Sequence, residues 1–261
     1  MNLNEMNAIR KLKNPKTPLL ILLAALAIFG LVGGHDVSLK LAILGTSLTA
    51  AMLAEWALFG AVPLAVLQSA AISGGIVGLL VAPGADPRFA WTAAVLAIAS
   101  KKLLVFHEGK HIFNPAAFGL VVSMMIFGNR INWWGNTSAV LVIVGGGLIL
   151  MRLRRLSLPF AYFIARTAGI VLLTSINAGR AALLLPNLFF AFIMLVEPKT
   201  SPGKRPEQWI FGGICGILAT TFYHFASVFE GDLLALLTVN LLRPWLTIRL
   251  AALQDNKRTS S

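Results

Sequence analysis

The sequence predicts an all-α protein that crosses a lipid bilayer about ten times. Of its 261 residues, 57 % are hydrophobic and only 12 % are charged, and the mean hydropathy is +0.79. Soluble domains carry roughly 25 % charged residues, so the composition excludes an ordinary soluble fold. Apolar runs also recur along the whole chain, which excludes a soluble domain with a single membrane anchor.

Ten apolar runs of roughly 15–22 residues are the expected membrane spans. They lie at 18–34, 40–58, 61–82, 89–106, 113–128, 137–151, 160–176, 181–196, 209–227 and 232–249. A full span needs about 20 residues, so the short runs at 113–128 and 137–151 indicate tilted or broken helices. We therefore expect a basic N-terminal segment over 1–17, a membrane domain over 18–250 and a tail over 251–261.

Basic residues gather in clusters outside these runs, and ten spans place all of the clusters on the same side of the membrane. The clusters lie at 10–16, 101–110, 152–155, 199–205 and 257–258. The alternate connections hold only Lys40, Arg88, Arg130 and Arg180. By the positive-inside rule, this pattern predicts a multi-pass protein of a bacterial or archaeal cytoplasmic membrane with both termini cytoplasmic. It also accounts for the net charge of +12 without nucleic acid as a partner, and we expect no cleaved signal peptide.

A weak internal repeat accompanies this topology. The segment VAPGADPRFAW at 81–91 leaves the third run, and VEPKTSPGKRPEQW at 196–209 leaves the eighth. Because five spans is an odd number, a repeat of about 18–128 over about 137–250 would be inverted, with a ligand site between the halves. Chance resemblance of two Pro-rich loops is the alternative.

Two polar segments beside apolar runs are the candidate binding site. They read HIFNPAAFG from position 111 and VEPKTSPGKR from position 196. Asn before Pro is typical of a helix start, and donors gathered at such a start favour an anion or a heterocycle. The candidate residues are Lys110, His111, Asn114, Glu197, Lys199, Thr200 and Ser201. An ordinary helix cap and an ordinary basic loop are the alternatives.

Glu55 and Arg166 lie inside the second and seventh runs. Charges inside a membrane are costly, so each side chain should find a partner within the protein. We expect either that they pair with each other or that one lines an ion path. Cys215 is the only cysteine, so the sequence predicts no iron–sulfur cluster and no metal site.

Several segments resemble the RnfD membrane protein of the Rnf electron-transport complex and the related NqrB protein of the sodium-pumping NADH:quinone oxidoreductase. KHIFNPAAFG at 110–119 resembles the family's K-N-x-F-N-P-A segment, and FFAFIMLVEPKTSPGKRPEQWIFGGICGIL at 189–218 resembles its F-F-x-A-T-D-P-V-T-x-P segment. EGDLLALLTVNLLRPWL at 230–246 resembles its last span. The resemblance implies ten helices in two inverted five-helix halves, similar to the urea-channel fold. It also implies flavin binding and electron transfer coupled to Na⁺ or H⁺ movement.

Departures from the family pattern change the expected cofactor chemistry. The family's S-G-A-T threonine, which carries FMN through a phosphoester, corresponds here to Asn187, and Asn187 has no hydroxyl for that bond. We therefore expect a non-covalent flavin, either FMN or riboflavin, with Asn187 near it. His111 and Glu197 stand where the family has Asn and Asp, so the pocket should differ as well.

Three functions are compatible with these patterns. The first is a membrane subunit of a flavin-dependent electron-transport complex, supplied with electrons by other subunits or by a separate flavoprotein or ferredoxin-type reductase. The second is a channel or transporter for a small solute or cation without a redox cofactor, and the third is a cofactor-free assembly subunit. Since the loops are too short for a soluble catalytic domain, we expect a component of an enzyme complex rather than a complete enzyme.

Overall fold

The computed structural model describes residues 16–33, 35–60, 63–106, 111–128, 130–175, 177, 187–225 and 230–244. Within these residues the regular structure is helical, and the only β-type pairings are two isolated bridges, Val81–Ile131 and Val105–His111. The predicted all-α class is therefore confirmed for the described residues.

Each of the ten predicted apolar ranges contains one helical segment of the described chain. The first five are α2 (Lys16–Val32), α3 (Val37–Phe59), α4 (Leu64–Leu80), α5 (Pro87–Leu103) and α6 (Pro115–Phe127). After the short turn η2 (Trp134–Asn136), α7 (Ala139–Leu141), η3 (Val142–Gly146) and α8 (Gly147–Leu153) form one continuous helix. Then follow α9 (Ser157–Leu173), a segment containing η4 (Phe190–Met194), α11 (Arg205–Phe225) and a last helix over 231–244.

Most of these helices are shorter than a full span. Within the described residues, one helix, Val37–Leu58, is long and apolar enough by length and composition to cross a membrane, and five further apolar helices have 10–17 residues. A helix of 17 residues is about 26 Å long, against about 30 Å for a hydrocarbon core. The ten-span topology and the inverted repeat therefore stay predictions.

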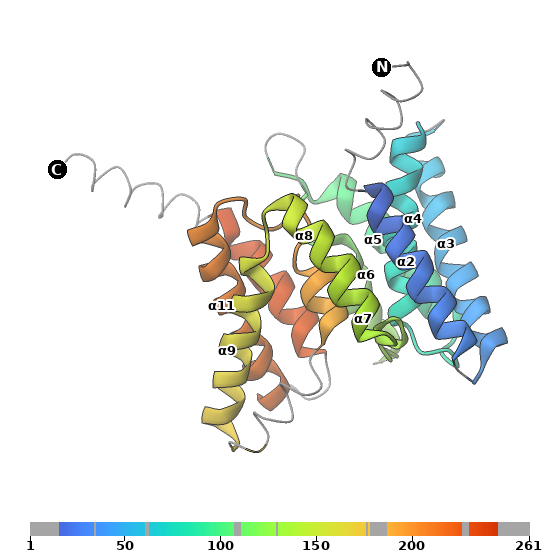
Figure 1. The fold of residues 1–261 in the computed structure, drawn as a ribbon. Coiled ribbons are helices and arrows are strands. Elements are labelled where there is room, and N and C mark those ends of the chain that lie inside the picture. The colour runs from blue at the N-terminus through green and yellow to red at the C-terminus, as the bar shows by residue number, and fades with distance from the viewer. Residues whose placement is uncertain are drawn as a thin grey trace, which may run out of the picture.

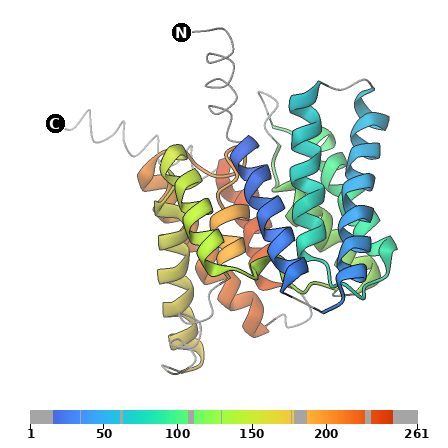
Figure 2. The same ribbon diagram turned by 45° about the vertical axis from the view of Figure 1, so that its right-hand side comes forward.

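The helices form two groups that meet along α2 and the 139–153 helix. Figures 1 and 2 show α3 and α4 on one side of the molecule and α9 and α11 on the other. At the junction, the short π-helix η3 packs against both α2 and η4. Gly145 and Gly146 allow this contact, because a Cβ on them would lie 2.7 Å from Leu22 Cδ1 and 3.0 Å from Phe192 Cβ.

The basic connections lie at one end of the helices. Lys16 at the start of α2, Lys101 near the end of α5 and Lys199 after η4 all line the same cavity there. At the opposite end, the Ala82 amide donates to the Arg130 carbonyl at 2.7 Å and the Asn132 amide donates to the Leu80 carbonyl at 2.8 Å. These contacts agree with the prediction that the basic connections and the alternate connections lie at opposite ends of the helices.

Gly119→Ala is expected to destabilise the close crossing of α5 and α6. A Cβ at Gly119 would lie 2.0 Å from the Ala93 carbonyl oxygen and 2.9 Å from the Ala97 amide nitrogen. Backbone atoms cannot rotate away, so the helices must separate, at a cost of about 1–3 kcal/mol in unfolding free energy. Thermal unfolding in detergent would measure it. Gly147→Ala is the control, since a Cβ there meets nothing within 4 Å, and equal melting temperatures would contradict the prediction.

Candidate functional site

A cavity of about 260 Å³ lies at the basic end, where the two groups of helices meet. Its apolar wall includes Leu19, Ile72, Ile76, Ile149, Phe192 and Val196. Its polar lining consists of Lys16, Ser69, Ser73, Lys101, His111, Asn114, Glu197 and Lys199. An apolar wall with a few convergent polar groups is typical of a small-molecule site.

The structure brings the two candidate segments together at this cavity. His111 Nε2 lies 2.9 Å from Glu197 Oε1, although the residues are 86 positions apart. The isolated bridge between Val105 and His111 holds the histidine in place, and the Ile112 amide donates to the Leu104 carbonyl at 2.8 Å. The His111 side chain is only 5 % exposed and that of Glu197 is 24 % exposed, so the pair is largely shielded from solvent.

Asn114, at the start of α6, hydrogen-bonds to two elements from the second half of the chain. Its Oδ1 accepts from the Ala117 amide at 3.0 Å, which confirms the predicted helix cap of α6. Its Nδ2 donates to the Met194 carbonyl at 3.0 Å, and its backbone amide donates to Asn240 Oδ1 at 2.8 Å. The side chain of Asn114 therefore connects α6 with the end of η4, and its backbone amide connects α6 with the last helix.

The loop after η4 is held by arginines from neighbouring helix ends. Arg155 Nη1 donates to both the carbonyl and the hydroxyl oxygen of Ser201, and Arg243 Nη1 donates to the Lys199 carbonyl at 2.6 Å. Burial, and then the neighbouring charge of Arg243, lower the pKa of Arg155 to about 10. Arg155 was not among the residues predicted for the site, because its place in a basic cluster indicated only topology.

Thr200 and Ser201 serve this loop rather than the cavity. Both are fully buried. The Ser201 hydroxyl donates to the Glu197 carbonyl at 2.7 Å, and Asn240 Nδ2 donates to the Thr200 carbonyl at 3.3 Å. Of the predicted candidates, His111, Asn114, Glu197 and Lys199 line the cavity, whereas Lys110 lies outside the described residues.

Two lysines that were not predicted for the site complete the polar lining. Lys101 Nζ donates to the carbonyl and the hydroxyl oxygen of Ser69 at 2.9 and 3.1 Å. For Lys16, burial and then the positive charge of Lys199 lower the pKa of the ammonium, while Glu55 acts in the opposite direction. Lys16 and Lys199 are therefore close enough to repel each other.

The predicted pairing of Glu55 with Arg166 is wrong. Glu55 is buried on α3, where the basic charges that act on it are those of Lys101, Lys16 and Lys199. Its Oε2 has no hydrogen-bond partner among the described residues. Arg166 lies on α9 in the other group of helices, and its Nε is 3.5 Å from Asp232 Oδ1.

Asp232 is the centre of a second buried cluster. It is fully buried at the start of the last helix, where its Oδ1 accepts from the Tyr162 hydroxyl at 2.6 Å. Its Oδ2 accepts from Asn187 Nδ2 at 2.9 Å, and Asn187 Oδ1 accepts from the Phe190 amide at 3.1 Å. Asn187 thus binds Asp232 and does not line the cavity that contains His111, and its predicted place near a flavin stays a prediction.

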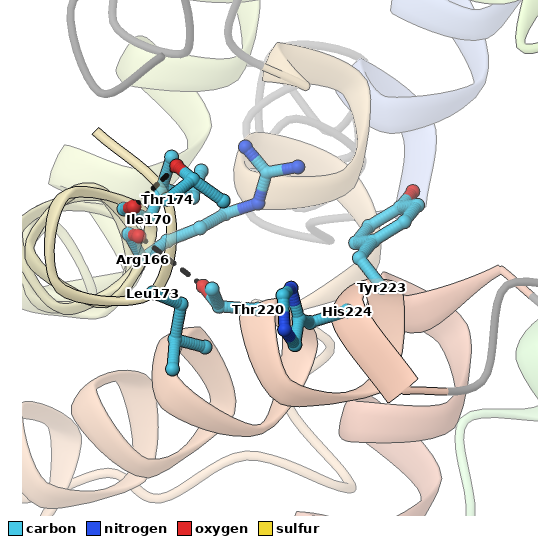
Figure 3. A pocket seen from close by; sticks show the side chains of 7 residues that line it. All are labelled: Arg166, Ile170, Leu173, Thr174, Thr220, Tyr223 and His224. Carbon is cyan, nitrogen blue, oxygen red and sulfur yellow. Dashed lines mark hydrogen bonds between the residues drawn. The ribbon is translucent and has the colours of Figure 1, made fainter. Parts of the chain in front are cut away.

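A second cavity of about 200 Å³ lies next to this cluster, between α9 and α11. Figure 3 shows Arg166, Thr220, Tyr223 and His224 around it. The Thr220 hydroxyl donates to the Arg166 carbonyl at 3.2 Å, and the Arg166 guanidinium carbon lies 5.5 Å from the centre of the Tyr223 ring. The described residues include no group of three or more His, Cys, Asp and Glu side chains that could hold a metal ion.

Comparison with known protein families agrees with the resemblance in the second half of the chain. Residues 124–251 match the model of the NQR2, RnfD, RnfE family. The match begins within α6, so it includes Glu197, Lys199 and Asp232 but neither His111 nor Asn114. Over these residues the chain is similar to the NQR2, RnfD, RnfE family, the membrane subunit kind of Rnf- and Nqr-type electron-transport complexes.

Proposed function

We propose that this protein relays electrons through a non-covalently bound flavin, as a membrane subunit of an Rnf- or Nqr-type complex. The observation that carries the proposal is the meeting of the His111–Asn114 segment with the Glu197 loop around one cavity. These segments lie about eighty residues apart in sequence, and each brings polar groups to an apolar wall.

The lining of the cavity is compatible with a flavin. The isoalloxazine ring has apolar faces and a polar edge, and the cavity has both kinds of surface. Its volume of about 260 Å³ is slightly below the usual range of about 300–1,000 Å³. We expect the ring to occupy the cavity and the ribityl chain to extend towards its rim.

The protein's own residues would bind and orient this cofactor. His111 and Asn114 would face its polar edge, and Glu197 would hold His111 in place through their contact at 2.9 Å. The redox chemistry is that of the flavin, and the nearby lysines would set the charge around it. Asn187 has no hydroxyl and already binds Asp232, which supports a non-covalent rather than a phosphoester-linked cofactor.

The remaining parts of the proposal concern the membrane and the partners. We propose ten spans with the basic end and both termini in the cytoplasm of a bacterial or archaeal cell. Electrons would arrive from other subunits or from a flavoprotein or ferredoxin-type reductase at that end. Coupling to Na⁺ or H⁺ movement would use a buried ionisable side chain such as Glu55, whose Oε2 is unpartnered among the described residues.

The visible absorption spectrum of the detergent-purified protein tests the cofactor. Flavin bands are expected in the native protein, and acid precipitation should release them into the supernatant because no covalent bond holds the flavin. Flavin retained in the pellet would contradict the argument from Asn187. A spectrum without flavin bands, after growth with ample riboflavin, would contradict the proposal.

A channel or transporter for a small solute or cation is the second candidate. It is favoured by two separate cavities, one of about 260 Å³ at the α2 junction and one of about 200 Å³ between α9 and α11, each with at least one charged side chain in its lining. Solute or cation flux through vesicles containing the colourless protein would support this function.

A further inference from the structure

We infer that a basic patch, where α8 ends and α11 begins, binds the headgroup of an anionic phospholipid. The basic patch consists of Arg152, Arg154, Lys204 and Arg205, whose side chains are all exposed. Figures 1 and 2 show the end of α8 and the start of α11 at the same end of the molecule. None of the four residues lines the cavity that His111 and Glu197 share, so the inference is independent of the proposed flavin.

A buried glutamine fixes the backbone of the basic patch. Gln208 on α11 is fully buried, and its Nε2 donates to the Arg154 carbonyl at 3.0 Å and to the Gly203 carbonyl at 2.9 Å. One side-chain amide therefore holds the turn after α8 against the loop before α11. Arg155 supports the same contact, because its Nη1 donates to the Ser201 carbonyl at 2.9 Å. The basic side chains thus extend from a fixed backbone, so less conformational freedom is lost when a ligand binds.

The arginines of the basic patch have donors to offer to a ligand. Within the described part of the chain, no ion pair or side-chain hydrogen bond engages the guanidinium groups of Arg152, Arg154 and Arg205. The carboxylate of Glu207 lies 3.7 Å from Lys204 instead. A guanidinium group can donate two parallel hydrogen bonds to the oxygens of a phosphate. Three such groups on one fixed backbone therefore favour an anionic phosphate ester.

Exposed apolar side chains continue from the basic patch along the neighbouring helices. Leu148 and Met151 on α8, and Phe160 and Ile164 on α9, are each more than half exposed. Trp209 on α11 is exposed as well, and Trp is typical of the interface between lipid headgroups and acyl chains. A phospholipid needs both surfaces in this order, since its phosphate lies at the membrane surface and its acyl chains lie below it.

Two other ligands share part of this chemistry. A free phosphate ester would use the guanidinium groups but would gain nothing from the exposed apolar side chains. An acidic soluble protein would reach the basic patch from water and would leave the same apolar side chains uncovered. The continuity of the basic and apolar surfaces along α8 and α9 therefore favours the lipid.

Lipid binding by the full chain in detergent tests the inference. The delipidated protein is titrated with phosphatidylglycerol and with phosphatidylcholine of the same acyl chains, and native mass spectrometry counts the bound lipids. Phosphatidylglycerol should bind more tightly, because its headgroup is anionic whereas that of phosphatidylcholine also carries a positive charge. Arg152→Gln and Arg205→Gln should each weaken phosphatidylglycerol binding about fivefold and leave phosphatidylcholine binding unchanged.

Arg130→Gln is the matched control. Arg130 is also exposed, but it lies at the opposite end of the helices, where its carbonyl accepts from the Ala82 amide. The variant has the same net charge as the two test variants and should keep the native affinity. Equal losses in all three variants would overturn the inference, because any basic residue near lipid headgroups would then explain the binding.

Gln208→Leu tests whether the fixed backbone matters. The substitution keeps all four basic side chains but removes both hydrogen bonds that join the turn after α8 to the loop before α11. Phosphatidylglycerol binding should weaken about threefold or more, because the ligand must then order the arginines itself. Native affinity in this variant would overturn the inference of a preformed site. If Gln208→Leu does not fold, the arginine variants, which change exposed positions, still decide the result.

The remaining outcomes concern the other ligands. Equal affinities for the two lipids would overturn the inference. Displacement of phosphatidylglycerol by glycerol 3-phosphate at similar concentrations would also overturn it, because the acyl chains would then contribute nothing. Displacement by poly-L-glutamate at similar concentrations would overturn the lipid as the ligand and assign the basic patch to an acidic protein.

Discussion

Asp232→Ala is expected to lower the unfolding free energy by about 3–5 kcal/mol, because it leaves a positive charge without its partner in a largely buried site. Three side chains contact this carboxylate: Tyr162 at 2.6 Å, Asn187 at 2.9 Å and Arg166 at 3.5 Å. Equilibrium or thermal unfolding in detergent would measure the loss. Asp86→Asn is the control at an exposed carboxylate, and the native melting temperature is expected there.

A double-mutant cycle can separate the ion pair from the rest of the cluster. Arg166→Met in the Asp232→Asn background removes both charges, and replacing a buried pair by neutral groups is often close to neutral in stability. The double variant should therefore be more stable than the sum of the single losses predicts. Glu55→Gln should show no such coupling to Arg166, since Asp232 is the carboxylate paired with it. Additive losses at Arg166 and Asp232 would contradict this pairing.

Asn114→Ala is expected to cost about 2–4 kcal/mol of unfolding free energy and to abolish flavin binding at the proposed site. The change removes a helix cap worth about 1 kcal/mol and the nearer donor to the buried Met194 carbonyl, at about 1–3 kcal/mol, which leaves the Glu197 amide at 3.5 Å as the remaining donor among the described residues. Since Asn114 connects α6 to η4, the two walls of the cavity should also lose their alignment. Unfolding in detergent and flavin fluorescence titration would measure the two effects.

Asn114→Asp provides the informative comparison. Aspartate keeps the cap to the Ala117 amide, but its carboxylate cannot donate to the Met194 carbonyl. We therefore expect Asn114→Asp to lose less unfolding free energy than Asn114→Ala does, and to lose flavin binding fully. Asn132→Ala, at an exposed position in the 130–133 connection, should behave as the native protein. Native flavin affinity in Asn114→Ala would exclude this residue from the site.

The last helix connects the Asp232 cluster with the cavity that His111 and Glu197 line. It carries Asp232 at its start and Asn240 two turns later, where Asn240 binds both the Asn114 amide and the Thr200 carbonyl. Eight residues of α-helix span about 12 Å. A shift of this helix would therefore move Asp232, which contacts Arg166, together with Asn240, which binds Asn114 beside the cavity.

Much of this organisation could be predicted from local signals. Apolar runs located the ten helical segments within the described part of the chain, because burial in lipid or in a core of this size requires continuous apolar sequence. Asn114 before Pro115 located the start of α6, since that pair favours a helix cap. The juxtaposition of His111 and Glu197 was implied only by their expected position on one side of the membrane, and the structure supplies the contact.

The errors have a common physical cause. Pairing of Arg166 with Glu55 is one of the two expectations because both lie inside apolar runs, but the partner of Arg166, Asp232, is the first residue of the last run. Lys16 and Lys101 were interpreted as topology signals only, although both line the cavity. A helix that is apolar on every side carries no pattern that tells which face meets which neighbour.

The sequence by itself determined the all-α class, the positions of the helices, the alternation of basic connections and the two polar segments of the site. Only the tertiary structure decided that Asn187 belongs with Asp232, that Thr200 and Ser201 hold a loop, and that three lysines surround one cavity. The physical reason is range: caps and apolar runs act over a few residues, whereas these contacts depend on how whole helices rotate and pack.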